Sequence, residues 1–290
     1  MIRKAIAKGF YFFKKDFLEK DIENCFLDPF GPRYIPKNIK KSKNLVAGIV
    51  PHAGYVYSGP AAAFLYKELY ENWDFDTIVI IGTNHTGYGS EYSSLVSMDW
   101  ETPLGIVKTD KEFGKELINT FDVFEDELAH LYEHSIEVQL PFLQYFFKDN
   151  FKIVPIVVRD ENLDRIRKFV KVLDDIAKKL NRKIFVLISS DFTHHGKYYD
   201  YYIFEENISE NVRKLDMKYI EKILSLDSEG FLKTIYENKG TVCGYSPILI
   251  FIEYTKLKNG KVELLKYYNS GEKTGEEDFV VGYASIISYL

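Results

Sequence analysis

Three apolar runs that each end in a histidine-bearing segment constrain this chain more than any other feature. Residues 184–188 are all apolar, and residues 189–195 then read Ser-Ser-Asp-Phe-Thr-His-His. Such an uninterrupted apolar run is typical of a strand that is buried on both faces of a parallel sheet. Two similar runs, at 45–50 and 77–81, lead in the same way to His52 and His85. The sequence therefore predicts an α/β protein with polar groups at the ends of its strands.

The carboxyl ends of parallel strands share one edge of a sheet, and ligand sites in α/β proteins form at that edge. His52, His85, His194 and His195, four of the six histidines, follow predicted strands closely. We therefore expect imidazole groups from distant parts of the chain to meet in one pocket.

Alternating strand-like and helix-like segments predict a single α/β domain over 1–290, with a largely parallel central sheet that is mixed at its edge and covered by helices on both faces. The expected strands and β segments are 45–50, 77–81, 94–98, 104–109, 151–158, 184–188, 261–269 and 279–288. Helices are expected near 16–25, from Pro60, from Asp110, and at 127–147, 163–180, 206–224, 228–237 and 246–256.

Charge and cysteine content exclude several classes of protein. The net charge of −5 argues against a nucleic-acid partner, which requires a concentrated positive field. Residues 45–66 lack charged side chains, but Pro51, Pro60 and a central histidine argue against a membrane span. Cys25 and Cys243 are too few for a disulfide framework, and the lysine-bearing N-terminus has no clean apolar leader, so we expect a cytoplasmic location.

The loop histidines are candidate metal ligands, because neutral imidazole is the commonest metal ligand in proteins. His52 and His85 are the main candidates. Asp191 and His194 could orient a ligand or act as acid and base, although Asp191 could also simply cap the backbone after its strand. His195 is expected to point away from its neighbour. Cys243 fits a buried apolar role, a soft metal ligand or a nucleophile.

A local motif offers a rival metal site. His130-Leu131-Tyr132-Glu133-His134 fits the H-x-x-E-H pattern of a class of zinc peptidases, in which both histidines share a helix face. Alternatively, His134 and Glu137 lie one helical turn apart and face the same way. The pattern has only three fixed positions, so it supports a zinc peptidase weakly.

Several longer motifs resemble the successive signatures of the Memo family. They are Pro51-His52-Ala53-Gly54-Tyr55-Val56-Tyr57-Ser58-Gly59, Gly82-Thr83-Asn84-His85, Glu133-His134-Ser135-Ile136-Glu137-Val138-Gln139-Leu140-Pro141, Ser189-Ser190-Asp191-Phe192-Thr193-His194, Tyr245-Ser246-Pro247 and Gly282-Tyr283-Ala284. The resemblance covers nearly the whole chain. It departs from the family at the N-terminus, where Phe12 stands in place of a proline, and at His195.

The resemblance implies the fold of the class III extradiol dioxygenases, whose non-haem iron is held by two histidines and a glutamate. His52 and His85 match the two histidine ligands, and His194 matches the acid/base histidine. Memo-like chains carry a cysteine as third ligand, here Cys243, which shifts the expected metal from iron toward copper or zinc. Tyr57, His134 and Glu137 are expected to line the pocket. AMMECR-type and radical-SAM proteins are the partners that the resemblance suggests.

Two main functions remain. The first is a metal-dependent oxidoreductase that carries out oxygen-dependent chemistry on a small organic substrate. The second is a binding module without catalysis, whose cleft receives a peptide or a partner protein between tyrosines and imidazoles. A cysteine hydrolase that pairs Cys243 with a histidine is a third, minor possibility.

Overall fold

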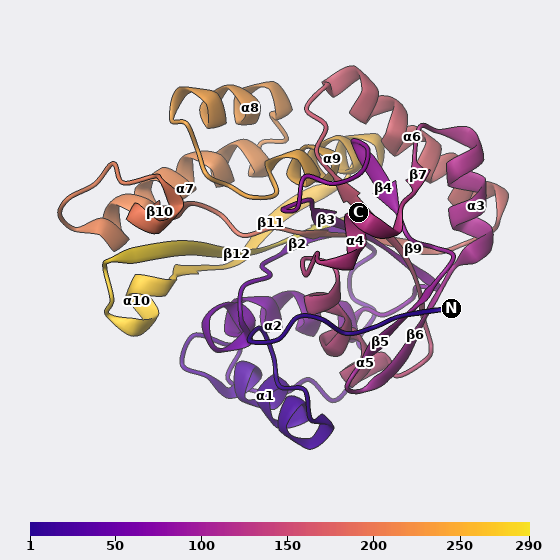
Figure 1. Ribbon diagram of the computed structural model, residues 1–290, viewed down its shortest axis with the longest axis horizontal. Helices are drawn as coiled ribbons and strands as arrows, with labels where there is room; N and C mark the ends of the chain where they lie inside the picture. Colours follow the sequence, from indigo (N-terminus) through magenta and orange to yellow (C-terminus); the bar gives the residue numbers. More distant parts are fainter.

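The computed structural model describes residues 1–290, which form a layered α/β structure (Figure 1). Its helices are α1 (Lys15–Leu27), α2 (Tyr55–Glu71), α3 (Lys111–Thr120), α4 (Glu127–Leu131), α5 (Leu140–Phe147), α6 (Leu163–Lys179), α7 (Ile208–Leu224), α8 (Ser228–Glu237), α9 (Tyr245–Leu257) and α10 (Ser270–Thr274). Its strands are β1 (Ile2–Arg3), β2 (Leu45–Val50), β3 (Thr77–Thr83), β4 (Tyr92–Ser94), β5 (Asp99–Thr102), β6 (Gly105–Thr109), β7 (Phe124–Glu125), β8 (Lys152–Val158), β9 (Ile184–Ser189), β10 (His194–Gly196), β11 (Lys261–Asn269) and β12 (Phe279–Tyr289).

The central sheet is parallel in its middle and antiparallel toward one edge. Strands β6, β8, β3, β9 and β2 are neighbours in this order and run parallel. On the far side of β2, β12 pairs antiparallel with β2, β11 and β10. The predicted fold class, a largely parallel sheet that is mixed at the edge, is therefore confirmed.

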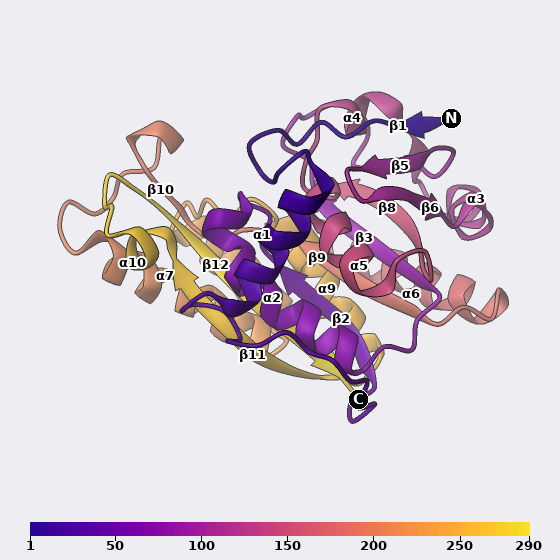
Figure 2. The same cartoon turned by 90° about the horizontal axis from the view of Figure 1, so that it is seen from below.

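Helices cover both faces of this sheet, as Figures 1 and 2 show: α1, α2 and α5 lie on one face, and α3, α6 and α9 on the other. The alternation of side chains along β3 explains why both layers form. Ile78 and Ile80 point into the core under α1, α2 and α5, whereas Val79 and Ile81 point into the core beneath α6 and α9. A strand with two buried faces has to be largely apolar, which is the pattern that the middle of β3, Ile78 to Ile81, shows.

Three smaller expectations differ from the observed elements. Helix α2 begins at Tyr55 rather than at Pro60. The N–H of Tyr55, which has no partner within the helix, donates to the Phe10 carbonyl at 2.8 Å and so allows the earlier start. Between β11 and β12, where the charged and glycine-containing sequence predicts only a turn, the chain forms the short helix α10. The β segment expected at 94–98 is also shifted, since β4 ends at Ser94.

The predicted continuous helix over 127–147 is wrong, and this difference bears directly on the site. Helix α4 ends at Leu131, a turn follows, and α5 starts only at Leu140 after a short 3₁₀ segment. The Glu133 carboxylate accepts the N–H groups of His134 and Ser135, at 2.8 and 2.9 Å, and so stabilises a turn in place of helical hydrogen bonds.

No helix of this structure combines the length and apolar character that crossing a bilayer requires. The uncharged stretch at 45–66 is divided between β2 and α2.

Candidate metal centre

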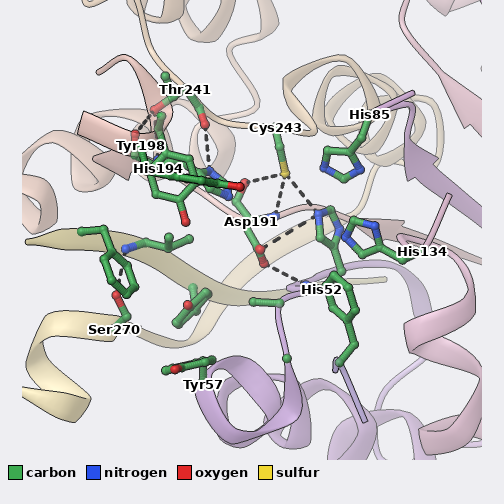
Figure 3. Close-up of a pocket in the computed structure, with 17 residues that line it drawn as sticks. His52, Tyr57, His85, His134, Asp191, His194, Tyr198, Thr241, Cys243 and Ser270 are labelled. Atoms are coloured by element: carbon green, nitrogen blue, oxygen red, sulfur yellow. Dashed lines mark hydrogen bonds and ion pairs between the residues drawn. The ribbon is translucent and has the colours of Figure 1, made fainter. Parts of the chain in front are cut away.

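A cavity of about 610 Å³ lies at the carboxyl edge of the parallel strands (Figure 3). It is lined by Phe10, His52, Ala53, Gly54, Tyr57, His85, His134, Asp191, His194, Tyr198, Tyr199, Thr241, Cys243, Ser270, Phe279, Val281 and Tyr283. The lining contains four histidines and the Cys243 thiol but no lysine or arginine. Its polar groups therefore suit metal coordination and proton transfer rather than charge pairing with an anion.

The strand order explains why distant residues meet here. Strand β9 lies between β2 and β3, so the segment after β9, which carries Asp191, is flanked by the loops that follow β2 and β3. His52 comes from the loop after β2, and His85 from the loop after β3. The turn after α4 adds His134.

Three imidazoles converge in the inner part of this cavity. His52, His85 and His134 each offer one ring nitrogen, and these nitrogen atoms lie within 4.8 Å of one another. The ring of His134 stacks on that of His85 with centroids 4.8 Å apart, and both stand nearly perpendicular to His52. Three nitrogens at this separation can contact one transition-metal ion with small side-chain movements.

Hydrogen bonds fix the orientation of two of these rings. Nδ1 of His52 lies 3.0 Å from Oγ of Ser189, a hydroxyl that itself donates to the Ser135 carbonyl. Nδ1 of His85 lies 3.0 Å from a Glu133 carboxylate oxygen. In both rings the outer contact occupies Nδ1, so Nε2 is the nitrogen left for a metal.

The thiol of Cys243 lies beside the same group. Its Sγ is 3.3 Å from Nε2 of His52 and accepts the Asp191 N–H at 3.3 Å. Burial raises the pKa of Cys243, but the two neighbouring histidines outweigh burial and lower that pKa to about 6. The next residue is a glycine for a steric reason: a Cβ at Gly244 would lie 2.5 Å from the Ser190 side chain. This close approach brings Cys243 to the sheet edge.

The histidines differ in their proton affinity. Burial and the neighbouring His52 lower the pKa of His134 to about 3, so this ring is neutral at pH 7. Burial alone would also lower the pKa of His85, but Cys243 and Glu133 outweigh it and raise that pKa to about 10. Without a bound metal, the centre is therefore an imidazolium flanked by a thiolate and a carboxylate.

Asp191 and His194 line the outer side of the centre. One oxygen of Asp191 accepts the backbone N–H of His52 at 2.8 Å, so this carboxyl does hold the backbone of the loop after β2. Burial raises the pKa of Asp191. Nδ1 of His194 lies 3.0 Å from the Phe192 carbonyl and 3.1 Å from the Thr241 carbonyl. Nδ1 therefore donates to these carbonyls, which leaves Nε2 as the ring nitrogen that is free for a ligand.

His195 faces away from the cavity, as expected, and its Nε2 accepts the N–H groups of Ile203 and Phe204. Glu137, in contrast, does not lie where we expected it. It is not part of the pocket wall, because its carboxylate points to the N-terminal segment and accepts from Arg3, Ala7 and Tyr11. The expectation assumed a helix through His134 and Glu137, and the turn there redirects the two side chains.

The same turn removes the basis of the zinc-peptidase motif. His130 is on α4, fully buried, with Nε2 at 3.0 Å from the Ser93 carbonyl and its ring packed edge-on against Trp100. It is not part of the histidine cluster. His130 and His134 therefore do not share a helix face.

Sequence reasoning missed several groups of this site. Glu133, which contacts His85 and His134, was noted only as part of a motif. Phe10, whose ring stacks on His134 with centroids 4.2 Å apart, belongs to Gly9-Phe10-Tyr11, the part of the N-terminal family signature that is kept here, but it was assigned no role at the site. The cavity also has aromatic walls, which come from the 3₁₀ segment after β10 (Tyr198 and Tyr199) and from β12 (Phe279 and Tyr283).

The donor set fits a transition metal. Three imidazole nitrogens and one polarised thiol are ligands that suit zinc, copper and iron rather than magnesium or calcium. The fold and the site together define an α/β protein with a histidine-rich, metal-competent cleft at the carboxyl edge of its sheet.

Comparison with known proteins gives the family. Residues 3–287 match the Memo-like protein family. The chain is 42% identical over 284 residues to a MEMO1 family protein of Saccharolobus islandicus, with 96% of each chain covered. It is 40% identical over 290 residues to one of Sulfurisphaera tokodaii, with 99% of each covered. This protein belongs to the Memo-like family.

Proposed function

We propose that the cleft binds a redox-active metal, iron or copper, and supports oxygen-dependent chemistry on a small organic substrate. The observation that carries this proposal is the convergence of His52, His85 and His134 within 4.8 Å, with the Cys243 thiol 3.3 Å from His52. The proposed ligands are His52, His85 and Cys243, and His134 is the competing third ligand.

The chain's own residues supply the rest of the chemistry. When bound, the metal would provide electron transfer between substrate and oxygen. His194 keeps its Nδ1 proton on two carbonyls, so its Nε2 can take or return a proton at a substrate atom. Asp191 holds the His52 loop and keeps one oxygen near the cavity. Phe10, Tyr199 and Tyr283 offer apolar ring surface, which suits a flat organic molecule.

A metal analysis of purified variants tests this proposal. The protein would be isolated anaerobically, loaded with Fe(II) or Cu(I), desalted, and assayed for bound metal by mass spectrometry. We expect one ion per chain in the wild type and a loss in His52→Ala and His85→Ala. His195→Asn and Cys25→Ala are matched controls outside the cavity, and we expect them to keep the ion.

The same assay decides the third ligand. A loss in Cys243→Ala with retention in His134→Ala identifies the thiolate, and the reverse identifies the imidazole. Unchanged metal content in both His52→Ala and His85→Ala would defeat the proposal.

A second candidate function is a binding module for a peptide or a partner protein. The aromatic rim favours it: Tyr57, Tyr198 and Phe279 line the cavity although 38%, 89% and 42% of their surfaces are exposed. Exposed aromatic side chains at a cavity mouth are common in recognition sites. Partners that stay bound after chelation of metal, without turnover of any small substrate, would support this function instead. AMMECR-type and radical-SAM proteins are the first candidates for that experiment.

For the cellular location we propose the cytoplasm. Both cysteines are free thiols, and Cys25 is buried beneath α2. Free thiols without any disulfide suit a reducing compartment.

A further inference from the structure

We propose that Glu133 is a positioning residue that holds His85 and His134 as a pair, so that the metal affinity of the cleft depends on this one buried carboxylate. The proposal rests on the proposed metal site and assigns a role to a residue outside its ligand set.

The contacts of Glu133 join two separate segments of the chain. One carboxylate oxygen accepts the backbone N–H of His85 at 2.7 Å. The other lies 3.0 Å from Nδ1 of His85 and accepts the backbone N–H groups of His134 and Ser135. Four donors therefore converge on one carboxylate, which links the loop after β3 to the turn after α4.

This arrangement determines which ring nitrogen of His85 is available. Because Nδ1 donates to the carboxylate, a metal can approach only at Nε2, and the negative charge makes that nitrogen a stronger ligand. His52 is held differently, since its Nδ1 contacts the neutral hydroxyl of Ser189. Glu133 is thus the charged outer partner in the histidine cluster.

The backbone around Glu133 is itself held from two sides. The Arg3 side chain donates to the carbonyl of Glu133 at 2.7 Å and to that of His130 at 3.0 Å. On the other side, the turn packs directly on β3: a Cβ at Gly82 would lie 2.5 Å from Oγ of Ser135 and 2.8 Å from Ile136. The carboxylate therefore has little freedom to move away from His85.

A change of Glu133 to glutamine preserves its size but removes this pattern of acceptors. The carboxylate presents acceptors on both oxygens, whereas an amide has one oxygen and one NH₂ group. If the amide oxygen takes the place of the oxygen that accepts from Nδ1 of His85 and from the His134 N–H, the NH₂ group faces the backbone N–H of His85, donor against donor. We expect Glu133→Gln to lose this backbone anchor and to leave Nδ1 of His85 on a neutral oxygen, so that the ring is held less firmly and Nε2 is a weaker ligand.

The test measures metal affinity in competition with a chelator, using Zn(II) and Co(II) as probes and no turnover assay. We expect Glu133→Gln to bind each metal about 10- to 100-fold more weakly than the wild type, the usual range for loss of a partner of a metal-bound histidine. Glu127→Gln, an exposed change on neighbouring α4, is the matched control and should bind as the wild type does. Glu133→Gln affinity within twofold of the wild type would overturn the proposal.

A second measurement on the unaltered chain covers the case in which Glu133→Gln does not fold. In zinc-loaded protein labelled with ¹⁵N-histidine, we expect His85 to keep a proton on Nδ1 and to bind zinc through Nε2. Coordination of His85 through Nδ1 would overturn the proposal. Failure of the underlying metal site is distinguishable, because the wild type itself would then not retain either probe metal.

Discussion

Replacing Arg3 with methionine should destabilise the protein far more than its position near the N-terminus suggests. The Arg3 guanidinium is buried, with 4% of its side chain exposed, and it pairs with a Glu137 carboxylate that is 0% exposed. It also donates to the carbonyls of His130 and Glu133 and lies over the Trp100 ring at 4.2 Å. Methionine keeps the approximate length and the contact with Trp100 but none of the donors.

The magnitude follows from what is left unpaired. Removing one member of a buried ion pair costs about 3–5 kcal/mol, because the other charge stays buried without compensation. Glu137 would still accept the N–H groups of Ile6 and Ala7 and the Tyr11 hydroxyl. We therefore expect a loss near the lower limit, about 3 kcal/mol in the free energy of unfolding.

Lys4→Met provides a control at the next residue. Lys4 also forms an ion pair, with Glu101, but 71% and 35% of these two side chains are exposed. Exposed pairs contribute about 0–1 kcal/mol. Urea denaturation, followed by circular dichroism and tryptophan fluorescence, would measure both variants, and coincident transitions would justify a two-state treatment.

The reasoning would be refuted if Arg3→Met cost no more than Lys4→Met. A further check is the double variant Arg3→Met/Glu137→Gln. It removes both charges, so it should be more stable than the sum of the two single changes predicts.

Two further predictions concern pH. Burial lowers the pKa of His130 to about 4, so between pH 6.5 and 4 the unfolded chain binds a proton there that the folded chain does not. The free energy of unfolding should therefore decrease as the pH is lowered through this window. The stability advantage of the wild type over His130→Gln should shrink by about 3 kcal/mol between pH 7 and pH 4. An unchanged stability difference between the two proteins, measured by urea denaturation, would contradict this. With a pKa near 6, Cys243 should be about 90% thiolate at pH 7, whereas burial raises the pKa of Cys25. Iodoacetamide at pH 7 should then modify Cys243 first in the metal-free protein, as peptide mass spectrometry would show, and equal labelling of both thiols would disprove it.

The sequence by itself determined the fold class and the most regular part of the site. Buried parallel strands need long apolar runs, and the runs at β2, β3 and β9 placed His52, His85 and Asp191 at one edge of the sheet. This inference needs only strand direction and adjacency, both of which local pattern and chain connectivity constrain.

Tertiary structure decided the remainder of the site. Residues 127–147 have enough apolar residues for one helix, but Glu133 stabilises a turn there through contacts with His85, and Glu137 instead binds Arg3. These contacts join residues 48 and 134 positions apart. Periodicity reports only the preferences of neighbouring residues, whereas buried charges are placed by partners that the folded chain brings to them, and these partners determined the positions of Glu133 and Glu137.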